Sequence, residues 1–218
     1  MTIRLVVFDF DRTVADIPAP STWELIDRAL NCEEEDRSLN QAYHSGKIDY
    51  ATWSRETVEL YKRYGLNKSK FEDVMKNYVR PMVGAQEVLD SLRKNGKITA
   101  IVSGSILNVY DFLRSRYGVR ADYVSFASEI FFNGDGNVTG GNFTNYDYEG
   151  KVEAIERICE QAGVPIKESA MVGDSHNDIF AFRKVGLPIA FNSKDQELIK
   201  EAKFVIKEKD LRKILPLV

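Results

Sequence analysis

Two aspartates stand close together near the start of the chain, in the segment VVFDFDRT. Asp9 and Asp11 follow a mainly apolar, β-branched run, Ile3 to Phe8, which predicts a strand buried on both faces. Side chains alternate along a strand, so both carboxylates are expected on the same side. Two carboxylates at a buried strand end repel each other unless a cation neutralises them. The pair therefore indicates a metal site rather than a turn or a helix cap.

Three further segments carry polar side chains just after predicted strands. In AIVSGSILNV, Ser103 and Gly104 are expected to end a strand and open a helix, where backbone N–H groups suit phosphate. In MVGDSHNDIFAF, Asp174 and Asp178 share one loop, and such oxygen-rich loops suit Mg²⁺. Lys151 opens the helical segment KVEAIERI and is expected to point into the same cleft. These groups together predict a site for a phosphate and a divalent cation.

This set of side chains suits phosphoryl transfer to a carboxylate. Mg²⁺ and a lysine ammonium offset the repulsion between a carboxylate nucleophile and a phosphate group. A second carboxylate can protonate the leaving alkoxide and then deprotonate a water molecule. The chain has only two histidines, too few for a zinc cluster. His176 is expected to be solvated or to lie beside the metal ligands, and His44 is expected on the surface.

The elements that hold these residues form an α/β pattern. Apolar runs predict buried strands, and amphipathic helical segments lie between them, as in a parallel sheet covered on both faces. The predicted strands are Ile3 to Phe8, Ile98 to Val102, Ala170 to Val172, Leu187 to Phe191 and Phe204 to Ile206.

Two segments interrupt this alternation. Residues 15–81 contain amphipathic helical patterns and no good strand, which predicts an inserted helical cap above the strand ends. Residues 1–14 and 82–218 are then the catalytic core. Turn residues between short β-prone runs predict a small β-hairpin from Glu129 to Asn145.

Composition excludes several classes of protein. The chain has 218 residues, a formal charge of −3 and 44% hydrophobic residues, so it can bury a core and lacks a broad basic surface for nucleic acid or anionic lipid. No segment has the apolar length of a membrane span, and the N-terminal run is too short for a signal peptide. Cys32 and Cys159 are interpreted as ordinary thiols in a reducing cytosol. A cytoplasmic location is therefore expected, and the oligomeric state is left open.

The chain resembles the haloacid dehalogenase superfamily, and it is most similar to the phosphoserine phosphatase branch. All four motifs occur in order: Asp9-Phe10-Asp11-Arg12-Thr13, then Ser103-Gly104, then Lys151, then Gly173-Asp174-Ser175-His176-Asn177-Asp178. The resemblance spans nearly the whole chain. It implies a Rossmann-like core, a helical cap that closes over the site, and Mg²⁺ as the cofactor.

The resemblance also implies a role for each motif residue. Asp9 would be the nucleophile and Asp11 the general acid and base. The metal would be held by the side chains of Asp9 and Asp174 and by the backbone carbonyl of Asp11. The phosphoryl group would be bound by Thr13, Ser103, Gly104 and Lys151. Asn177 and Asp178 would support the loop and help to position Lys151 or metal-bound water, and Arg12 is expected to be solvated.

The cap departs from the family pattern at the positions that would grip a serine substrate. A glutamate and an arginine are typical there, and an ungapped comparison places Ser21 and Thr57 at those positions. Glu24 and Arg55 lie nearby in the sequence. Tyr50 and Trp53 are candidates for contact with a less polar or aromatic leaving group. Loss of the charged pair predicts that phosphoserine is hydrolysed no better than other small phosphomonoesters.

The expected function is Mg²⁺-dependent hydrolysis of a small phosphorylated metabolite through an aspartyl phosphate, with phosphoserine as one candidate. One alternative is a phosphotransferase that passes the group to a small alcohol at the same site. Another is a phosphoaspartate receiver domain of a signalling relay. The receiver is disfavoured because its phosphoacceptor would end a middle strand, where this chain carries Ser103.

Overall fold

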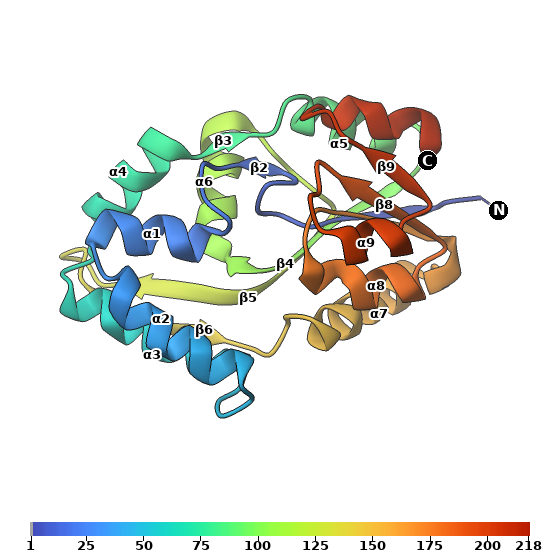
Figure 1. Ribbon diagram of the computed structural model, residues 1–218. Helices are drawn as coiled ribbons and strands as arrows, with labels where there is room; N and C mark the ends of the chain where they lie inside the picture. The colour runs from blue at the N-terminus through green and yellow to red at the C-terminus, as the bar shows by residue number, and fades with distance from the viewer. Residues whose placement is uncertain (1) are drawn as a thin grey trace.

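The computed structural model describes residues 2–218. Within them, a seven-stranded sheet has the order β6-β5-β4-β1-β7-β8-β9 (Figure 1). Only β5 and β6 pair antiparallel, and the other neighbours are parallel. The strands are β1 (Leu5–Phe8), β4 (Ile98–Ile106), β5 (Tyr123–Phe132), β6 (Val138–Phe143), β7 (Ser169–Gly173), β8 (Leu187–Phe191) and β9 (Phe204–Ile206). The predicted α/β fold with a parallel sheet is confirmed.

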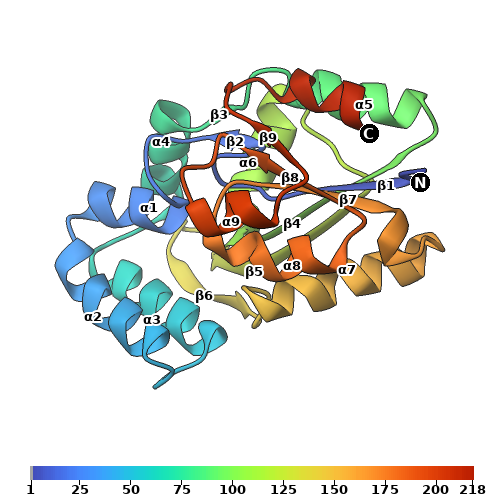
Figure 2. The same cartoon turned by 45° about the vertical axis from the view of Figure 1, so that its right-hand side comes forward.

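Helices cover both faces of this sheet. Alternate residues of the central strand point to opposite sides, so Val6 and Phe8 enter one hydrophobic core and Leu5 and Val7 enter the other. Figure 2 shows α5 and α6 on one side of the sheet and α7, α8 and α9 on the other. Their bounds are α5 (Ala85–Lys94), α6 (Leu107–Tyr117), α7 (Glu149–Ala162), α8 (Ile179–Lys184) and α9 (Gln196–Glu201), and short 3₁₀ helices span Ile166–Glu168, His176–Asp178 and Leu211–Leu217.

Strand β4 runs past the point at which the sequence predicted its end. It continues through Ser103 and Gly104 to Ile106, and α6 begins only at Leu107. The extra residues stay in the sheet because Ile106 still pairs with Ser128 of β5, beyond an irregularity in register. The prediction that Ser103 and Gly104 open a helix is therefore wrong, and no helix N-terminus lies at this point.

The predicted hairpin is part of the main sheet. Its first strand, β5, begins earlier, at Tyr123, where it pairs in parallel with β4. The later half of β5 extends beyond the other strands and pairs with β6 beside α3 (Figure 1). The early half was missed because the segment YVSFAS is neither continuously apolar nor strictly alternating.

Four helices lie between the first and second strands of the main sheet. They are α1 (Thr22–Leu30), α2 (Glu33–His44), α3 (Tyr50–Arg63) and α4 (Lys68–Tyr78). A small antiparallel ribbon of β2 (Ala15–Asp16) and β3 (Arg80–Pro81) brings the two connections together. The helices pack around aromatic rings, with the Trp23 and Trp53 centroids 5.0 Å apart. Assignment of residues 15–81 as a separate cap stays a prediction.

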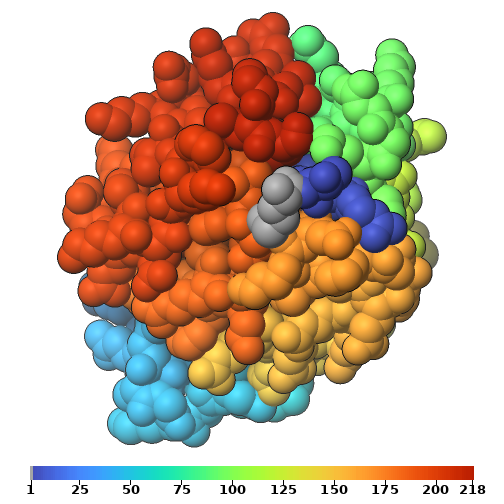
Figure 3. All heavy atoms as spheres, turned by 90° about the vertical axis from the view of Figure 1, so that its right-hand side faces the viewer, coloured from blue at the N-terminus to red at the C-terminus, as the bar shows by residue number. Residues whose placement is uncertain are grey.

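The cap lies at one end of the molecule. In Figure 3, which views the end where β1 begins, the C-terminal third of the chain covers much of the surface and the cap appears along the lower edge. Among the residues that the structure describes, no helix combines the length and apolar character that crossing a bilayer requires.

The segment between β6 and α7 makes a tight turn before Lys151. Tyr148, just before α7, has a positive φ of 48°. The backbone of Asn145, earlier in the chain, lies close to Gly150. A Cβ atom on Gly150 would lie only 1.7 Å from the backbone oxygen of Asn145. Glycine at this position therefore allows the chain to reverse directly before the helix that carries Lys151.

We expect Gly150→Ala to lower the free energy of unfolding by about 1–3 kcal/mol, because the new methyl group overlaps backbone. Urea denaturation measures the change. Gly134→Ala is the matched control, since nothing lies within 4 Å of a Cβ atom at Gly134. The control is expected to change stability by less than about 0.5 kcal/mol. Equal stability of the two variants would contradict the tight turn.

Candidate active site

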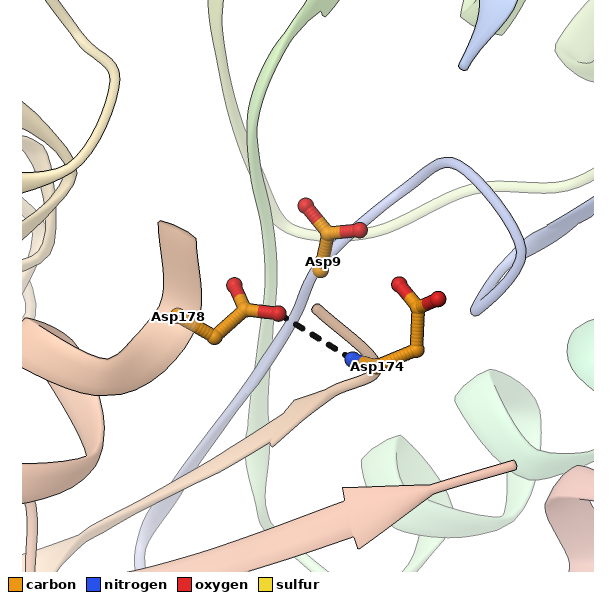
Figure 4. Close-up of side chains that lie close together, drawn as sticks. All are labelled: Asp9, Asp174 and Asp178. Carbon is orange, nitrogen blue, oxygen red and sulfur yellow. Dashed lines mark hydrogen bonds between the residues drawn. The ribbon is translucent and has the colours of Figure 1, made fainter. Parts of the chain in front are cut away.

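Three carboxylates meet at the carboxyl ends of the central strands. Asp9 follows β1, while Asp174 and Asp178 lie in the loop after β7. Each offers one oxygen, and these three oxygens all lie within 4.8 Å of one another. Figure 4 shows the Asp9 and Asp174 side chains rising side by side from the strand ends, with Asp178 reaching toward them from its helix. All three are buried, so their charges need partners inside the protein.

Lys151 supplies one partner. Its side chain is fully buried, and Nζ lies 2.7 Å from Oδ1 of Asp9 and 2.6 Å from Oδ1 of Asp178. Burial alone would lower the pKa of Lys151, but the two carboxylates outweigh it and raise that pKa above its usual range. Lys151 therefore stays positively charged and holds Asp9 and Asp178 in place.

The loop after β7 is ordered by Asp178. Its Oδ2 accepts hydrogen bonds from the backbone N–H groups of Asp174, at 3.1 Å, and Ser175, at 3.3 Å. Burial raises the pKa of Asp178 to about 6, against the opposing effect of Lys151. A Cβ atom on Gly173 would meet Oδ2 of Asp178 at 2.2 Å, so this carboxylate can close the loop only over a glycine.

Asp174 presents a second buried carboxylate beside Asp9. Its Oδ2 makes no well-aligned hydrogen bond within residues 2–218, although Nη2 of Arg12 lies 3.1 Å away. Burial, and then the nearby Asp9, raise the pKa of Asp174. A carboxylate oxygen beside a second carboxylate fits a hard cation that prefers oxygen ligands. Asp178 is already engaged by Lys151 and two backbone N–H groups, so Asp9 and Asp174 are the better ligands.

Arg12 was expected to be solvated, and the structure corrects this expectation. Nη2 of Arg12 lies 3.1 Å from Oδ2 of Asp174, and the Arg12 side chain is 29% exposed. Arg12 also has a left-handed backbone, with φ of 61°. The turn after β1 bends its side chain back toward Asp174, so a second cation stands at the edge of the carboxylate group.

Asp11 joins the strand end to the cap. Its carboxylate accepts hydrogen bonds from the backbone N–H and the hydroxyl of Thr22, at 2.8 and 2.5 Å, and from the Ser105 hydroxyl at 3.3 Å. Burial raises the pKa of Asp11 to about 6, although the Thr22 hydrogen bonds lower it. The first residue of α1 is thus bound directly to a motif aspartate.

A cavity of about 160 Å³ lies between the core and the cap. The structure brings nine of the sequence-predicted site residues to its wall. They are Asp9, Asp11, Ser21, Tyr50, Trp53, Ser103, Gly104, Asp174 and Asn177. Ser21 also caps α1, since its Oγ accepts a hydrogen bond from the N–H of Glu24. Lys151 and Asp178 lie behind the wall, where they contact Asp9 and Asp174.

Besides Lys151 and Asp178, two predicted residues do not reach the cavity wall. Thr57 is buried inside the cap, where its hydroxyl donates to Asp36 at 2.8 Å. Thr13 is buried in the turn after β1, and its hydroxyl has no hydrogen-bond partner among the described residues. Thr57 cannot contact a bound substrate from this position, because helix packing turns it toward α2.

The nearby charged residues of the cap point elsewhere as well. Glu24 forms an ion pair with Arg28 on the surface of α1, one turn along the helix. Arg55 lies on the exposed side of α3 beside Glu56. Neither Glu24 nor Arg55 lines the cavity, so neither replaces a charged pair for a serine substrate.

Sequence reasoning missed several residues that line the cavity. They are Asn40, Tyr43, Trp23, Ser105 and Asp147. His44 is exposed, as expected, and it also contributes to the wall. Asp147 accepts hydrogen bonds from the Tyr43 hydroxyl at 3.1 Å and from the Asn177 amide at 2.9 Å. It therefore connects the cap with the loop after β7. No local pattern marks Asp147, because its partners are 104 and 30 residues away.

The segment of β4 that carries Ser103 and Gly104 also contacts the cap. The backbone oxygen of Gly104 accepts hydrogen bonds from the Tyr50 hydroxyl and, at 3.3 Å, from Nε1 of Trp23. These hydrogen bonds fix Tyr50 and Trp23 beside the part of β4 that carries Ser103.

Known proteins share both the sequence and the shape of this chain. A family model for haloacid dehalogenase-like hydrolases matches residues 6–183. A phosphoserine phosphatase of Methanocaldococcus jannaschii is 33% identical over 220 residues, which cover 97% of this chain and 96% of that protein. The phosphoserine phosphatase of Saccharomyces cerevisiae is 28% identical over 192 residues, and the match spans 60% of its length.

Solved structures agree with these relatives. A phospho-aspartyl intermediate analogue of phosphoserine phosphatase superposes with a TM-score of 0.78 at 30% identity, over all of both chains. A substrate-bound phosphoserine phosphatase has a TM-score of 0.78 at 29% identity and covers all of this chain and 99% of the other. The match of motifs, fold and site geometry shows that this chain belongs to the haloacid dehalogenase-like hydrolase family.

Proposed function

We propose that this protein is a magnesium-dependent phosphatase that hydrolyses a small phosphate monoester through an aspartyl phosphate on Asp9. The observation that carries the proposal is the pairing of Asp9 with the buried ammonium of Lys151, beside the buried carboxylate of Asp174. A carboxylate held in this way is a nucleophile whose repulsion by phosphate is offset by positive charge.

The proposed reaction has two steps. Oδ1 of Asp9 is paired with Lys151, so Oδ2 attacks phosphorus, and the bond between phosphorus and the ester oxygen breaks. Asp11 gives its proton to the leaving oxygen, which departs as an alcohol. Asp11 then takes a proton from water as the water oxygen attacks phosphorus. The bond from Asp9 to phosphorus breaks, and inorganic phosphate leaves.

Other core residues would bind the phosphoryl group, hold the metal and position Lys151. Ser103 and Gly104 line the cavity beside Asp9, where a hydroxyl and backbone amides can bind phosphoryl oxygens. Mg²⁺ would be held by the carboxylates of Asp9 and Asp174 and the backbone carbonyl of Asp11, and it would neutralise charge on the phosphoryl group. Asp178 positions Lys151 and the loop after β7.

The relatives support hydrolysis of a small ester. Several are named phosphoserine phosphatase, which makes L-phosphoserine one candidate substrate. Transfer to a small alcohol at the same site is the alternative, and added alcohols would reveal it as phosphorylated products. A cytoplasmic location and the absence of nucleic-acid and membrane partners stay predictions from composition.

Asp9→Asn is expected to lower kcat by several orders of magnitude, because an amide is a poor nucleophile. Phosphate release from p-nitrophenyl phosphate measures the loss. An unchanged melting temperature would show that the fold persists. Turnover close to that of the unsubstituted enzyme would rule out the covalent route.

The role of Asp11 can be tested through the leaving group. An alkoxide needs a proton to depart, whereas p-nitrophenolate does not. We therefore expect Asp11→Asn to reduce kcat on glycerol phosphate at least about tenfold more than on p-nitrophenyl phosphate, within the usual range of about 10²–10⁴ for proton transfer. Equal losses on both esters would show that Asp11 acts in another way.

Removal of metal is expected to abolish activity. Excess EDTA should stop phosphate release, and added Mg²⁺ should restore it. Ca²⁺ should fail to restore it, because the larger ion takes more oxygen ligands and can engage both oxygens of Asp9. Calorimetric titration of the metal-free protein with Mg²⁺ supplies a second readout, and Asp174→Asn should weaken binding. Full activity in EDTA would contradict the proposal.

A further inference from the structure

The cap side of the cavity has an unusual combination of groups. Four aromatic side chains line it together with the amide of Asn40 and the imidazole of His44, and they are Trp23, Tyr43, Tyr50 and Trp53. None of the residues that line the cavity is a lysine or an arginine. A substrate carboxylate in this space would therefore meet no lysine or arginine on the wall, and Asp147, whose partners are neutral donors, would repel it.

Asp147 adds a carboxylate that is available to a ligand. Its partners are neutral donors, the Tyr43 hydroxyl and the Asn177 amide. No ion pair of Asp147 occurs within residues 2–218. Its negative charge raises the pKa of Tyr43, although burial of that phenol raises it more. Asp147 thus brings an uncompensated negative charge to a wall built of aromatic rings.

Asp147 also lies close to the phosphate-binding strand end. A carbon atom added to Gly104 would be 3.1 Å from Oδ1 of Asp147 and 3.1 Å from the Tyr50 hydroxyl. A short linker in the substrate would therefore be enough to join an ammonium group at Asp147 to a phosphoryl group at Ser103. Aromatic faces and a carboxylate are the groups that bind organic ammonium ions.

We propose that the cavity selects the phosphate ester of a short cationic amino alcohol that lacks a carboxylate, with Asp147 and the cap aromatics around the ammonium group. This inference rests on the proposed phosphatase function and names its substrate class. The amino group of phosphoserine can pair with Asp147, but the carboxylate of phosphoserine has no cation on the cavity wall to pair with. The unbonded indole N–H of Trp53 is a neutral donor and does not replace that cation.

Phosphoethanolamine and L-phosphoserine form a matched pair of substrates, because they differ only in the carboxylate. We expect kcat/KM to be at least about tenfold higher for phosphoethanolamine, the discrimination that one unpaired charge in a partly buried site commonly causes. The comparison is made at pH 8, above the usual titration range of imidazole. Equal efficiencies, or a preference for phosphoserine, would overturn the inference.

Asp147→Asn tests the role of the carboxylate. It should lower the ratio of kcat/KM for phosphoethanolamine to that for p-nitrophenyl phosphate by about tenfold, since only the first ester carries a cation. Asp135→Asn, in the exposed turn between β5 and β6, removes a surface carboxylate and should leave the ratio unchanged. An unchanged ratio in Asp147→Asn would overturn the assignment of Asp147.

Binding to the Asp9→Asn variant separates this inference from the proposed function. Calorimetry with Mg²⁺ present should show tighter binding of phosphoethanolamine than of phosphoserine. If no ester is hydrolysed by the unsubstituted enzyme but this preference holds, the phosphatase function fails and the ligand class stands. If p-nitrophenyl phosphate is hydrolysed and no preference appears in either assay, the function stands and the ligand class fails.

Discussion

The ammonium of Lys151, buried between Asp9 and Asp178, is the interaction on which the site depends. Without it, carboxylates within 4.8 Å of one another would face each other in a largely buried site. Asp178, which Lys151 holds in place, accepts two backbone hydrogen bonds from the loop after β7. These bonds fix the position of Asp174. One charged group thus holds the proposed nucleophile, a proposed metal ligand and a loop in a common geometry.

Residues of both the cap and the core form the wall of the site. Tyr50 and Trp23 bind the backbone of Gly104, and Tyr43 binds Asp147, which in turn binds Asn177. In the proposed reaction the chemistry lies in the core, whereas the groups that would meet the leaving part of a substrate come largely from the cap. This division allows related hydrolases to keep one mechanism and change substrates through cap residues.

The sequence was informative where strand geometry alone places a residue. Asp9, Asp11 and Asp174 could be assigned to one edge of the sheet because parallel strands end together. Asp147 and Tyr43 could not, since their positions depend on a turn and on cap packing. Ser103 was located correctly near the cavity, yet the strand that carries it continues to Ile106 because pairing with β5 outweighs the local turn signal. Thr57 was misplaced because an ungapped comparison takes no account of how α2 and α3 pack, and this packing turns Thr57 toward Asp36.

The two hydrogen bonds from Thr22 to Asp11 have a thermodynamic consequence. They favour the ionised carboxyl, whereas burial favours the neutral one. Any movement of α1 that withdraws Thr22 removes these donors and admits water, and both changes alter the proton affinity of Asp11. By linkage, protonation of Asp11 would then shift the equilibrium between the engaged and withdrawn positions of α1 by the free energy of the net change in the Asp11 pKa. Loss of the hydrogen bonds raises that pKa and entry of water lowers it, so the larger change sets the direction of the shift.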